Sequence, residues 1–306
     1  MRVFVAGGTG VVGRRLVPQL VARGHHVIAT TTGPDKAGTL RRLGAEAVVM
    51  DGLDAASVRQ AITAARPEAI VHQMTAISGK ADMKHMNRWF ATTNRLRTEG
   101  TDHLLAAAEA AGVSNFVAQS YAGWNGIRRG GWVKTEEEPL DLWEGTVAHP
   151  VMAAVRHTEE VVGKAGGAAL RFGWLYGPGA TESLVEPVRK RQFPIVGSGA
   201  GHTSWVHVDD AASATVLAVE QKATGVFNIV DDEPAPVSEW LPYLAECAGA
   251  KPPMRLPTWL ARPLAGNAVV GLMTEGRGFS NAKAKRELGW ALRYPTWRLG
   301  FKDELA

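Results

Sequence analysis

The chain has 306 residues, of which 45% are hydrophobic and 21% are charged. This composition is typical of globular proteins and excludes a disordered chain, a collagen or a coiled coil, while the length allows one large domain or two intimate ones. The net charge of +4 comes from basic residues scattered among acidic ones, so we expect a small-molecule substrate and no nucleic-acid partner.

Short apolar segments alternate with amphipathic ones through the first 175 residues. The predicted strands are Arg2–Ala6, His26–Thr30, Ala47–Met50, Ala69–Gln73, Asn115–Gln119 and Ala168–Arg171. The predicted helices between them are Val12–Arg23, Lys36–Leu43, Ala55–Ala65, Thr98–Ala111 and Val151–Ala165. This alternation predicts an α/β protein with a doubly wound parallel sheet, a Rossmann fold.

The pattern loosens after Tyr176, where prolines and glycines interrupt it. One more helix (Asp209–Glu220) and one more strand (Val226–Val230) are predicted, and Pro252–Gly278 is expected in a smaller, partly helical C-terminal lobe. We therefore predict a dinucleotide-binding domain over residues 1–175, to which 205–231 return. Residues 176–204 and 232–306 would form the substrate-binding lobe.

The sequence shows no sign of a membrane span, a secretory signal or a metal site. No apolar run reaches the roughly 18–20 residues needed to cross a bilayer, and the N-terminal one is too short for a secretory signal. The single cysteine, Cys247, can neither form an intrachain disulfide nor build a zinc site alone. We expect a cytoplasmic protein without a metal site or a membrane partner.

The first predicted strand runs into a glycine-rich turn that precedes a helix. The turn reads Gly7-Gly8-Thr9-Gly10-Val11-Val12-Gly13. In such a turn the first glycine permits the tight bend, the second lets the backbone approach a pyrophosphate, and the third lets the helix pack close to the strand. Free N–H groups at the helix start then face the phosphates. The turn predicts a dinucleotide site.

The ends of the second and third strands refine this site. The second strand ends in Thr31 and Thr32, with Lys36 nearby, and this neutral end favours NADP(H) over NAD, which usually meets an acidic residue there. NAD remains the alternative, because Asp35 lies close by and Lys36 is equally explained as an ordinary solvated lysine. After the third strand, we assign Asp51 to the adenine amino group, together with the adjacent backbone of Gly52 and Leu53. Asp54 is expected to cap the next helix.

Several segments together resemble the extended or atypical short-chain dehydrogenase/reductase superfamily, which includes NAD-dependent epimerases and dehydratases. They are the glycine turn, Val71–Ala76, the segment Leu170–Gly179 with its YGPG motif, the segment Trp205–Ala212 with its VHVDD motif, and Ser280–Trp290. The resemblance covers nearly the whole chain. It implies cofactor contacts from Met74, Thr75, Ala76 and Phe172, and a homodimer through two long helices.

The resemblance breaks where the family carries its chemistry. The family places a Tyr-x-x-x-Lys pair on the helix after the fifth strand. In the family a glutamate usually follows this pair. If that glutamate corresponds to Glu159, Val151 and Val155 stand at the pair. If it corresponds to Glu160, Met152 and Arg156 stand there. Neither alignment supplies a tyrosine. The family asparagine on the preceding helix is replaced by Arg97. We therefore expect the standard proton relay to be missing.

One hydroxyl group compensates for this loss in our interpretation. Tyr121 stands where the family has a Ser or Thr that bonds the reacting oxygen, and Ser120 precedes it. We predict Tyr121 as the proton donor, helped by Ser120, with His149 or Arg156 tuning it. The alternative is that Tyr121 only shapes the wall of the site.

Aromatic residues suggest what the site binds. Six of the ten tryptophans fall where the substrate is expected or in the loop Ala122–Ala148: Trp124, Trp132, Trp143, Trp174, Trp205 and Trp259. Trp124 and Trp174 are predicted to contact substrate, whereas about half of the six are expected in the core of the lobe. Lys84, His85 and Arg88 are candidates for an anionic group or a solvated helix face.

Three functions remain open on the sequence alone. The first is an NAD(P)-dependent oxidoreductase that transfers hydride to or from a carbonyl or alcohol carbon of a small, apolar or aromatic substrate. The second is a nucleotide-sugar epimerase or dehydratase, which the missing pair disfavours. The third is a dinucleotide-binding sensor without turnover, or a redox-neutral enzyme with a structural cofactor.

Overall fold

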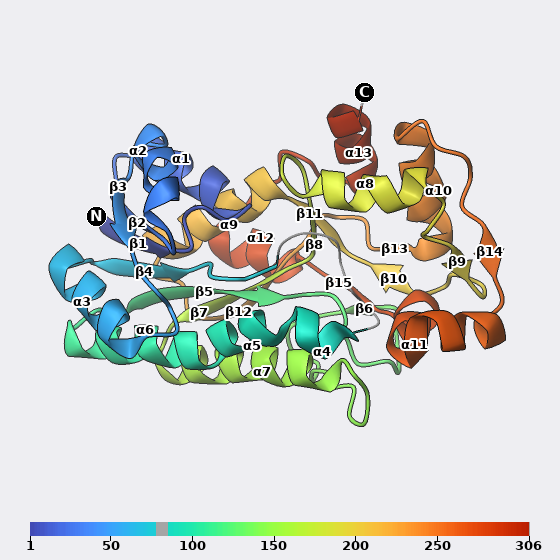
Figure 1. The fold of residues 1–306 in the computed structure, drawn as a ribbon, viewed down its shortest axis with the longest axis horizontal. Coiled ribbons are helices and arrows are strands. Elements are labelled where there is room, and N and C mark those ends of the chain that lie inside the picture. The colour runs from blue at the N-terminus through green and yellow to red at the C-terminus, as the bar shows by residue number, and fades with distance from the viewer. Residues whose placement is uncertain (78–84, 306) are drawn as a thin grey trace.

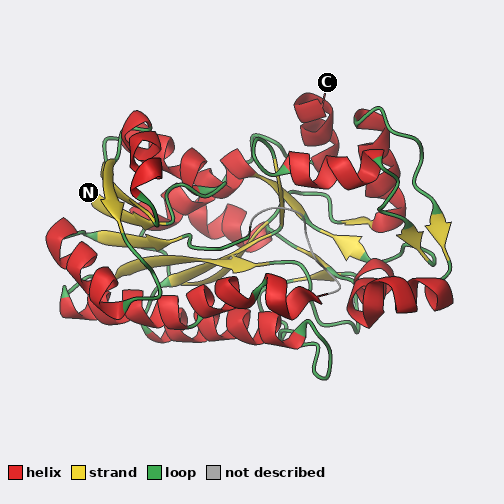
Figure 2. Cartoon of the chain, viewed as in Figure 1, coloured by secondary structure: helices red, strands yellow, loops and turns green. Residues whose placement is uncertain are grey.

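The computed structural model describes residues 1–77 and 85–305. A seven-stranded parallel sheet forms its centre (Figures 1 and 2), and the strand order is β12-β7-β5-β4-β1-β2-β3. The strands are β1 (Arg2–Ala6), β2 (His26–Thr31), β3 (Glu46–Val49), β4 (Ala69–His72), β5 (Asn115–Tyr121), β7 (Ala168–Phe172) and β12 (Gly225–Ile229). The predicted doubly wound sheet is confirmed, and the observed strand limits differ from the predicted ones by at most two residues.

Side chains alternate along the central strands and so build a core on each face of the sheet. In β1, Val3 and Val5 pack into one core and Phe4 and Ala6 into the other. The first core is covered by α1 (Gly13–Ala22), α2 (Ala37–Arg42), α9 (Val208–Glu220) and α12 (Ala282–Leu288). The second is covered by α3 (Ala55–Ala65), α6 (Glu99–Ala110) and α7 (His149–Lys164). Figure 1 shows these helices as layers on either side of the strands.

A separate core lies beyond the carboxyl ends of the strands. It is built from buried aromatic residues, among them Trp205, Trp240 and Phe301. The helices around it are α8 (Thr181–Arg189), α10 (Val237–Cys247), α11 (Thr258–Glu275) and α13 (Trp297–Leu305). The short strands there are β8 (Trp174–Tyr176), β9 (Ile195–Val196), β10 (His202–Thr203), β11 (Trp205–His207), β13 (Ala235–Pro236) and β14 (Arg255–Leu256).

Several local elements were not anticipated. A short helical turn, η1 (Pro34–Lys36), precedes α2, and α4 (Met86–Trp89) and α5 (Ala91–Arg97) precede α6. The loop Ala122–Ala148 contains β6 (Val133–Lys134), which pairs with β15 (Gly278–Phe279). In the stretch expected to be partly helical, α11 continues across a kink at Gly266, where φ is 83°.

Within residues 1–77 and 85–305, no helix combines the length and the apolar character that a bilayer span requires.

Candidate active site

The turn between β1 and α1 is shaped by positions that have no room for a side chain. Gly7 has a φ of 96°, and a Cβ there would lie 2.7 Å from the carbonyl oxygen of Gln73. A Cβ on Gly13 would lie 2.4 Å from the Gly7 carbonyl oxygen. At Gly10, which is exposed, a Cβ would meet only that same oxygen, at 3.3 Å. Gly7 and Gly13 are thus needed to form the turn, whereas Gly10 leaves its outer surface open to a ligand.

The start of α1 is equipped for an anion. The helix has no side-chain N-cap and no acidic residue in its first turn. Thr9 and Val11 are half-buried beside it, Val12 is buried, and Arg14 donates from Nε to the Thr9 carbonyl oxygen at 2.9 Å. Free N–H groups and the positive end of the helix dipole favour a phosphate here. The residues present therefore fit the pyrophosphate of a dinucleotide.

Sequence reasoning missed Thr30, which holds this turn to β2. Its Oγ1 accepts the backbone N–H of Gly7 at 3.0 Å, and its carbonyl oxygen accepts the N–H of Gly8 at 3.1 Å. The signal was present, because Thr30 lies at the end of the strand that pairs with β1.

The four side chains at and just beyond the end of β2 have different environments. Thr31 is 3% exposed, and its hydroxyl lies 3.5 Å from the Gly33 N–H. Thr32 and Lys36 are exposed. The Asp35 carboxylate lies over Gly33, where a Cβ would be 2.3 Å from Asp35 Oδ1. A carboxylate and an ammonium group are thus both available at the place where the ribose of a dinucleotide would lie.

The segments that follow β3 and β4 meet, as expected for a cofactor site in such a sheet. Asp51 accepts the Leu53 N–H at 2.9 Å, and Asp54 caps α3 by accepting the Ala56 N–H at 2.9 Å, as predicted. A Cβ on Gly52 would lie 2.5 Å from the sulfur of Met74.

Of the remaining residues assigned to the cofactor, Thr75 and Ala76 are exposed after β4. Phe172 is different, because it is 1% exposed and packs into the core beneath α1 and α9. The structure therefore places the Phe172 ring within the core.

The last two residues of β5 have different surroundings. Ser120 is 1% exposed, and its hydroxyl donates to Glu159 at 2.6 Å. Glu159 also accepts two bonds from Arg171, at 2.8 and 2.7 Å. The Ser120 hydroxyl is thus bound to a buried ion pair, and its help to Tyr121 stays a prediction. Tyr121 is half-buried and folds back over Gly123, where a Cβ would overlap the phenol oxygen.

The electrostatics of Tyr121 favour the protonated phenol. Desolvation raises its pKa well above the ordinary value, and the positive charge of Arg97 acts in the opposite direction. Its ring meets Trp124 edge to face, with 6.1 Å between ring centroids. At neutral pH Tyr121 is therefore a hydrogen-bond donor.

The two glutamates of α7 that were considered for the alignment have different environments. Glu159 is buried, whereas Glu160 is exposed and lies 3.5 Å from Arg156. Glu159 belongs to the packed face of α7, together with Val151 and Val155, which are 1% and 0% exposed. The alignment that places these valines at the family pair stays a prediction. Arg156 does not lie with these buried residues, because its side chain is on the exposed side of α7. The expectation that Arg156 tunes Tyr121 stays a prediction, which its exposed position beside Glu160 does not support.

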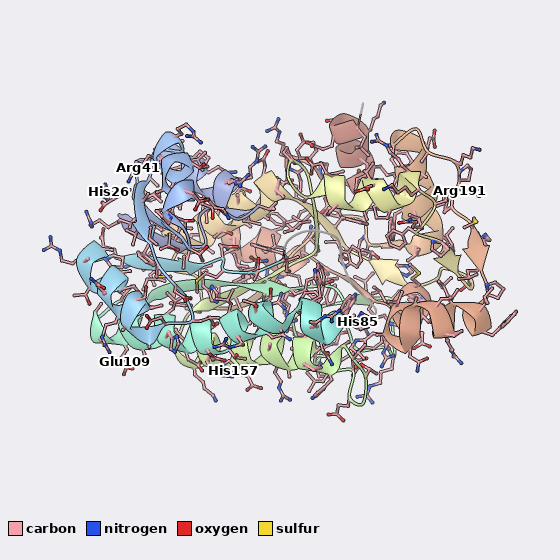
Figure 3. The ribbon with its side chains drawn as sticks, in the orientation of Figure 1. His26, Arg41, His85, Glu109, His157 and Arg191 are labelled. Carbon is pink, nitrogen blue, oxygen red and sulfur yellow. The ribbon has the colours of Figure 1, made fainter. Side chains whose placement is uncertain are left out.

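The two histidines of α7 have structural partners. His149 Nδ1 lies 3.0 Å from the carbonyl oxygen of Leu142 and so holds the end of the loop 122–148. His157 lies on the outer helical layer (Figure 3), with Nε2 at 2.8 Å from Asp102 of α6. No contact between His149 and Tyr121 is present in the described residues.

Three of the six tryptophans gather beside Tyr121. Trp124 and Trp143 are buried in one cluster with Val151 and Val155, and Trp143 Nε1 donates to the Trp124 carbonyl oxygen at 2.6 Å. Tyr121 and Trp174 pack against this cluster. The others lie elsewhere: Trp205 is in the core of the lobe, and Trp132 and Trp259 are 43% and 72% exposed.

The segment before α4 adds little to the described site. Lys84 lies outside the described residues, and His85 and Arg88 are exposed.

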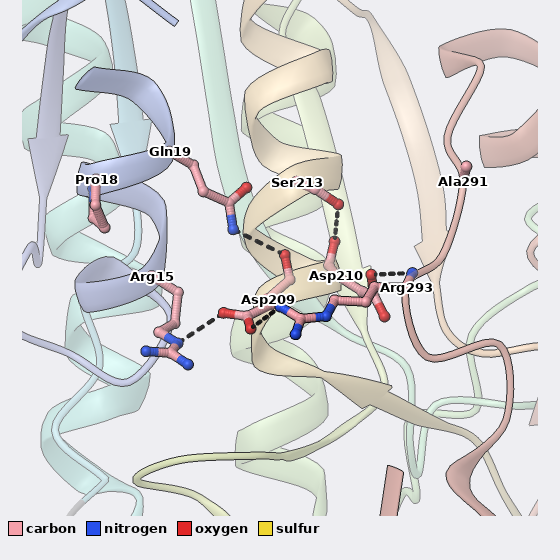
Figure 4. A pocket seen from close by; sticks show the side chains of 8 residues that line it. All are labelled: Arg15, Pro18, Gln19, Asp209, Asp210, Ser213, Ala291 and Arg293. Atoms are coloured by element: carbon pink, nitrogen blue, oxygen red, sulfur yellow. Dashed lines mark hydrogen bonds and ion pairs between the residues drawn. The ribbon is translucent and has the colours of Figure 1, made fainter. Parts of the chain in front are cut away.

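A surface pocket of about 440 Å³ lies between α1, α9 and the segment before α13 (Figure 4). Arg15 and Arg293 approach Asp209 at 2.7 and 3.6 Å. Asp210 accepts the N–H groups of Arg293 and Tyr294 at 2.7 and 2.9 Å. The charged side chains that line the pocket are therefore already paired with one another or with backbone N–H groups.

The fold and the glycine turn together define a dinucleotide-binding α/β enzyme. The family model described as "NAD dependent epimerase/dehydratase family" matches residues 3–230. The chain belongs to this family and is an NAD(P)-dependent oxidoreductase.

Curated relatives carry reductase names. The chain is 43% identical over 316 residues to a 3-diazoavenalumate denitrifying reductase of Streptomyces sp., covering 99% of this chain and all of that protein. It is 26% identical over 325 residues to 4-hydroxy-2-methyl-3-oxo-4-farnesyl-3,4-dihydroquinoline-1-oxide ketoreductase of Stigmatella aurantiaca, covering 96% and 92%.

Among solved structures, human epimerase family protein SDR39U1 with NADPH superimposes with a TM-score of 0.75. Its sequence identity is 20%, and the match covers 100% of this chain and 98% of that one. At this identity the likeness supports the fold alone.

Proposed function

We propose that this enzyme is an NAD(P)H-dependent reductase of small aromatic diazo compounds, which replaces the diazo group by hydrogen and releases N₂. The observation that carries the proposal is the substrate side of the site. There Tyr121 ends β5, while α7 contributes the buried Val151 and Val155 and has no tyrosine. The 43% identity to a named diazo-compound reductase supports the substrate class.

The reaction matches this set of residues. An epimerase or dehydratase must first remove a proton from a sugar hydroxyl, which requires a base beside it. When bound, the reduced dinucleotide supplies a hydride. At a diazonium carbon the hydride forms a C–H bond, the C–N bond breaks, and N₂ leaves with the electrons of that bond. The substrate gains two electrons, and no proton is taken from it or given to it.

In this proposal the residues near Tyr121 hold the substrate. Trp124 and Trp174 offer aromatic surfaces suited to a planar ring. The protonated phenol of Tyr121 donates a hydrogen bond to an oxygen atom of the substrate. The buried valines of α7 keep water from the reacting carbon.

The direct test uses the diazonium salt made from 3-aminocinnamate and ¹⁵N-labelled nitrite. With NADPH deuterated at the transferable position, we expect labelled N₂ in the headspace, one equivalent of oxidised cofactor, and cinnamate with deuterium at the former diazo carbon. Reactions without protein measure spontaneous decay. Deuterium absent from that carbon, or N₂ release at the spontaneous rate, would disprove the proposal.

Reduction of a keto group is the second candidate, and the Tyr121 hydroxyl favours it. A carbonyl that accepts hydride becomes an alkoxide and needs a proton, which Tyr121 is placed to give if the carbonyl binds beside it. An aromatic ketone tested beside the diazonium salt separates the two candidates by their turnover.

For the cofactor we propose NADPH. The exposed Thr32 and Lys36 suit a 2′-phosphate, whereas Asp35 suits the free ribose of NADH. Calorimetric titration with each nucleotide is the measurement. We expect NADPH to bind more tightly, and Lys36→Ala to reduce that difference. Tighter binding of NADH would reverse the assignment, and binding of neither would argue against an oxidoreductase.

A further inference from the structure

Arg97 is a buried cation that has no counter-ion among the described residues. It ends α5 and is 6% exposed, and its Nη1 has no hydrogen-bond partner in the part of the chain that the structure describes. Across residues 1–77 and 85–305, no carboxylate forms an ion pair with its guanidinium. Its backbone is firmly held, since its carbonyl oxygen accepts the hydroxyls of Thr101 and Thr158 at 2.7 and 2.8 Å.

The groups around Arg97 do not neutralise it. Burial lowers its pKa to about 10, so it stays charged at neutral pH. His72 is kept neutral, because burial lowers its pKa to about 4. Tyr121 remains a phenol at neutral pH for the reasons given above. The buried carboxylate of Glu159 is already occupied by Arg171. An unpaired buried guanidinium is costly, so the site is incomplete until an anion enters it.

Other polar atoms near the same strand ends also lack partners. Both side-chain polar atoms of Gln73, which follows β4, are buried and unpaired. The indole Nε1 atom of Trp124 is buried and has no partner within the described residues either. Gln73 and Trp124 follow the carboxyl ends of β4 and β5, the edge at which open α/β sheets bind ligands. Unpaired buried donors at this edge suit a ligand that accepts hydrogen bonds.

We propose that Arg97 binds an anionic oxygen group of the substrate, with Tyr121 as a second donor, and so makes the enzyme specific for anionic acceptors. This inference deepens the proposed reductase function by naming the substrate charge. The group is a carboxylate or an ionised phenol, since either places a negatively charged oxygen against the guanidinium.

Binding of unreactive anions to the oxidised holoenzyme tests the inference without turnover. Cinnamate is compared with cinnamamide, and 4-nitrophenolate with 4-nitroanisole, by calorimetry. We expect one anion to bind at least about tenfold more tightly than its neutral analogue. The pair that shows the preference identifies the carboxylate or the phenolate. If neither pair shows one, the proposal is overturned, whatever the outcome of the N₂ assay.

Variants then assign the preference to one side chain. Arg97→Gln should reduce the affinity for the anion by roughly 10- to 150-fold and leave the affinity for the neutral analogue unchanged. Arg97→Lys should lose less affinity for the anion, because the lysine retains the positive charge. Arg95→Gln is the matched control: it removes an exposed arginine of the same helix, which pairs with Glu99, and should change neither ligand.

Two results would overturn the assignment to Arg97. One is an Arg97→Gln protein that folds, binds cofactor and keeps the anion preference. If Arg97→Gln does not fold, Arg97→Lys provides the test. Its single ammonium group should reduce the affinity for the anion and leave the affinity for the neutral analogue unchanged. Equal weakening of both ligands, or of neither, would exclude Arg97 as the anion-binding residue.

Discussion

The two ends of the active site are built in different ways. At the cofactor end, the turn of Gly7 to Gly13 is shaped by backbone atoms that lie too close for side chains. At the substrate end, the end of β5 depends on side chains from α5, α7 and a long loop, which meet around Tyr121. A backbone-shaped site tolerates almost no substitution, whereas a side-chain site can change its chemistry while the fold is kept. The difference explains how a family fold carries an unfamiliar set of residues around its reacting centre.

The largest expected effect tests the cofactor end. Gly10→Val should abolish binding of NADPH and NADH, because the side chain would occupy the exposed surface that faces the pyrophosphate. The fold should survive, since a Cβ at this position meets only one atom, at 3.3 Å. Calorimetric titration measures the binding, and the thermal unfolding midpoint measures the fold.

Gly13→Val provides the contrast within the same turn. A Cβ there would lie 2.4 Å from the Gly7 carbonyl oxygen, so this variant should lose both cofactor binding and thermal stability. If Gly10→Val bound the cofactor normally, or destabilised the protein as much as Gly13→Val, the backbone-shaped account of the turn would be wrong.

The next effect tests the substrate end. Tyr121→Phe should leave cofactor affinity nearly unchanged and slow reduction of a keto acceptor by roughly 10²–10⁴-fold, the usual value of general acid catalysis. Reduction of a diazonium acceptor should fall by about tenfold, the value of one lost hydrogen bond, because N₂ departs without a proton. Steady-state rates with both acceptors give the two ratios.

Tyr243→Phe is the control for this substitution. Tyr243 lies in the lobe, where its hydroxyl donates to the Arg298 carbonyl oxygen at 3.2 Å, and its loss should change neither rate. If Tyr121→Phe turned over both acceptors at the full rate, Tyr121 would only shape the wall of the substrate site. Equal large losses would show that it transfers a proton in both reactions.

The same contrast explains what the sequence alone could reveal. The strands of the sheet and the glycine turn were predicted with small errors, because their signals are local: an apolar run, a glycine at a tight bend, a capping Asp54. α5, α8, α10, α12 and α13 were not predicted, and neither was the two-residue strand β6. Their stability comes from packing against segments distant in sequence, and local patterns carry little of that information.

The substrate end was harder to predict for the same reason. Tyr121 was singled out because it follows the predicted strand Asn115–Gln119, and its role as proton donor stays a prediction. The pairing of Ser120 with Glu159, the exposure of Arg156 and the burial of Phe172 depend on which face of an element packs. Arg97 was noticed as a replacement, but its missing counter-ion is a property of the folded chain alone.

The smallest effect concerns His72, which ends β4 between the two halves of the site. Its Nδ1 accepts the Met74 N–H at 3.2 Å, and its Nε2 lies 3.2 Å from the Leu96 carbonyl oxygen. Burial lowers its pKa from 6.5 to about 4. Between these values the unfolded chain binds the proton and the folded chain does not. The free energy of unfolding therefore rises with pH through this window, and the full contribution is present above pH 6.5.

Acidification should thus destabilise the protein by up to about 3 kcal/mol through this one group. Urea unfolding at several pH values between 4 and 7, compared with His72→Asn, isolates the contribution, because the buried Asp210 and Asp231 titrate in both proteins. An asparagine can still accept the Met74 N–H but cannot gain a proton. The free energy of unfolding of His72→Asn should therefore change less with pH. Identical pH dependence in the two proteins would mean that the pKa of His72 is the same in the folded and unfolded chains, so that the folded protein takes up this proton near pH 6.5. A charged His72 beside Arg97 would in turn require an anion at the substrate end even before the substrate binds.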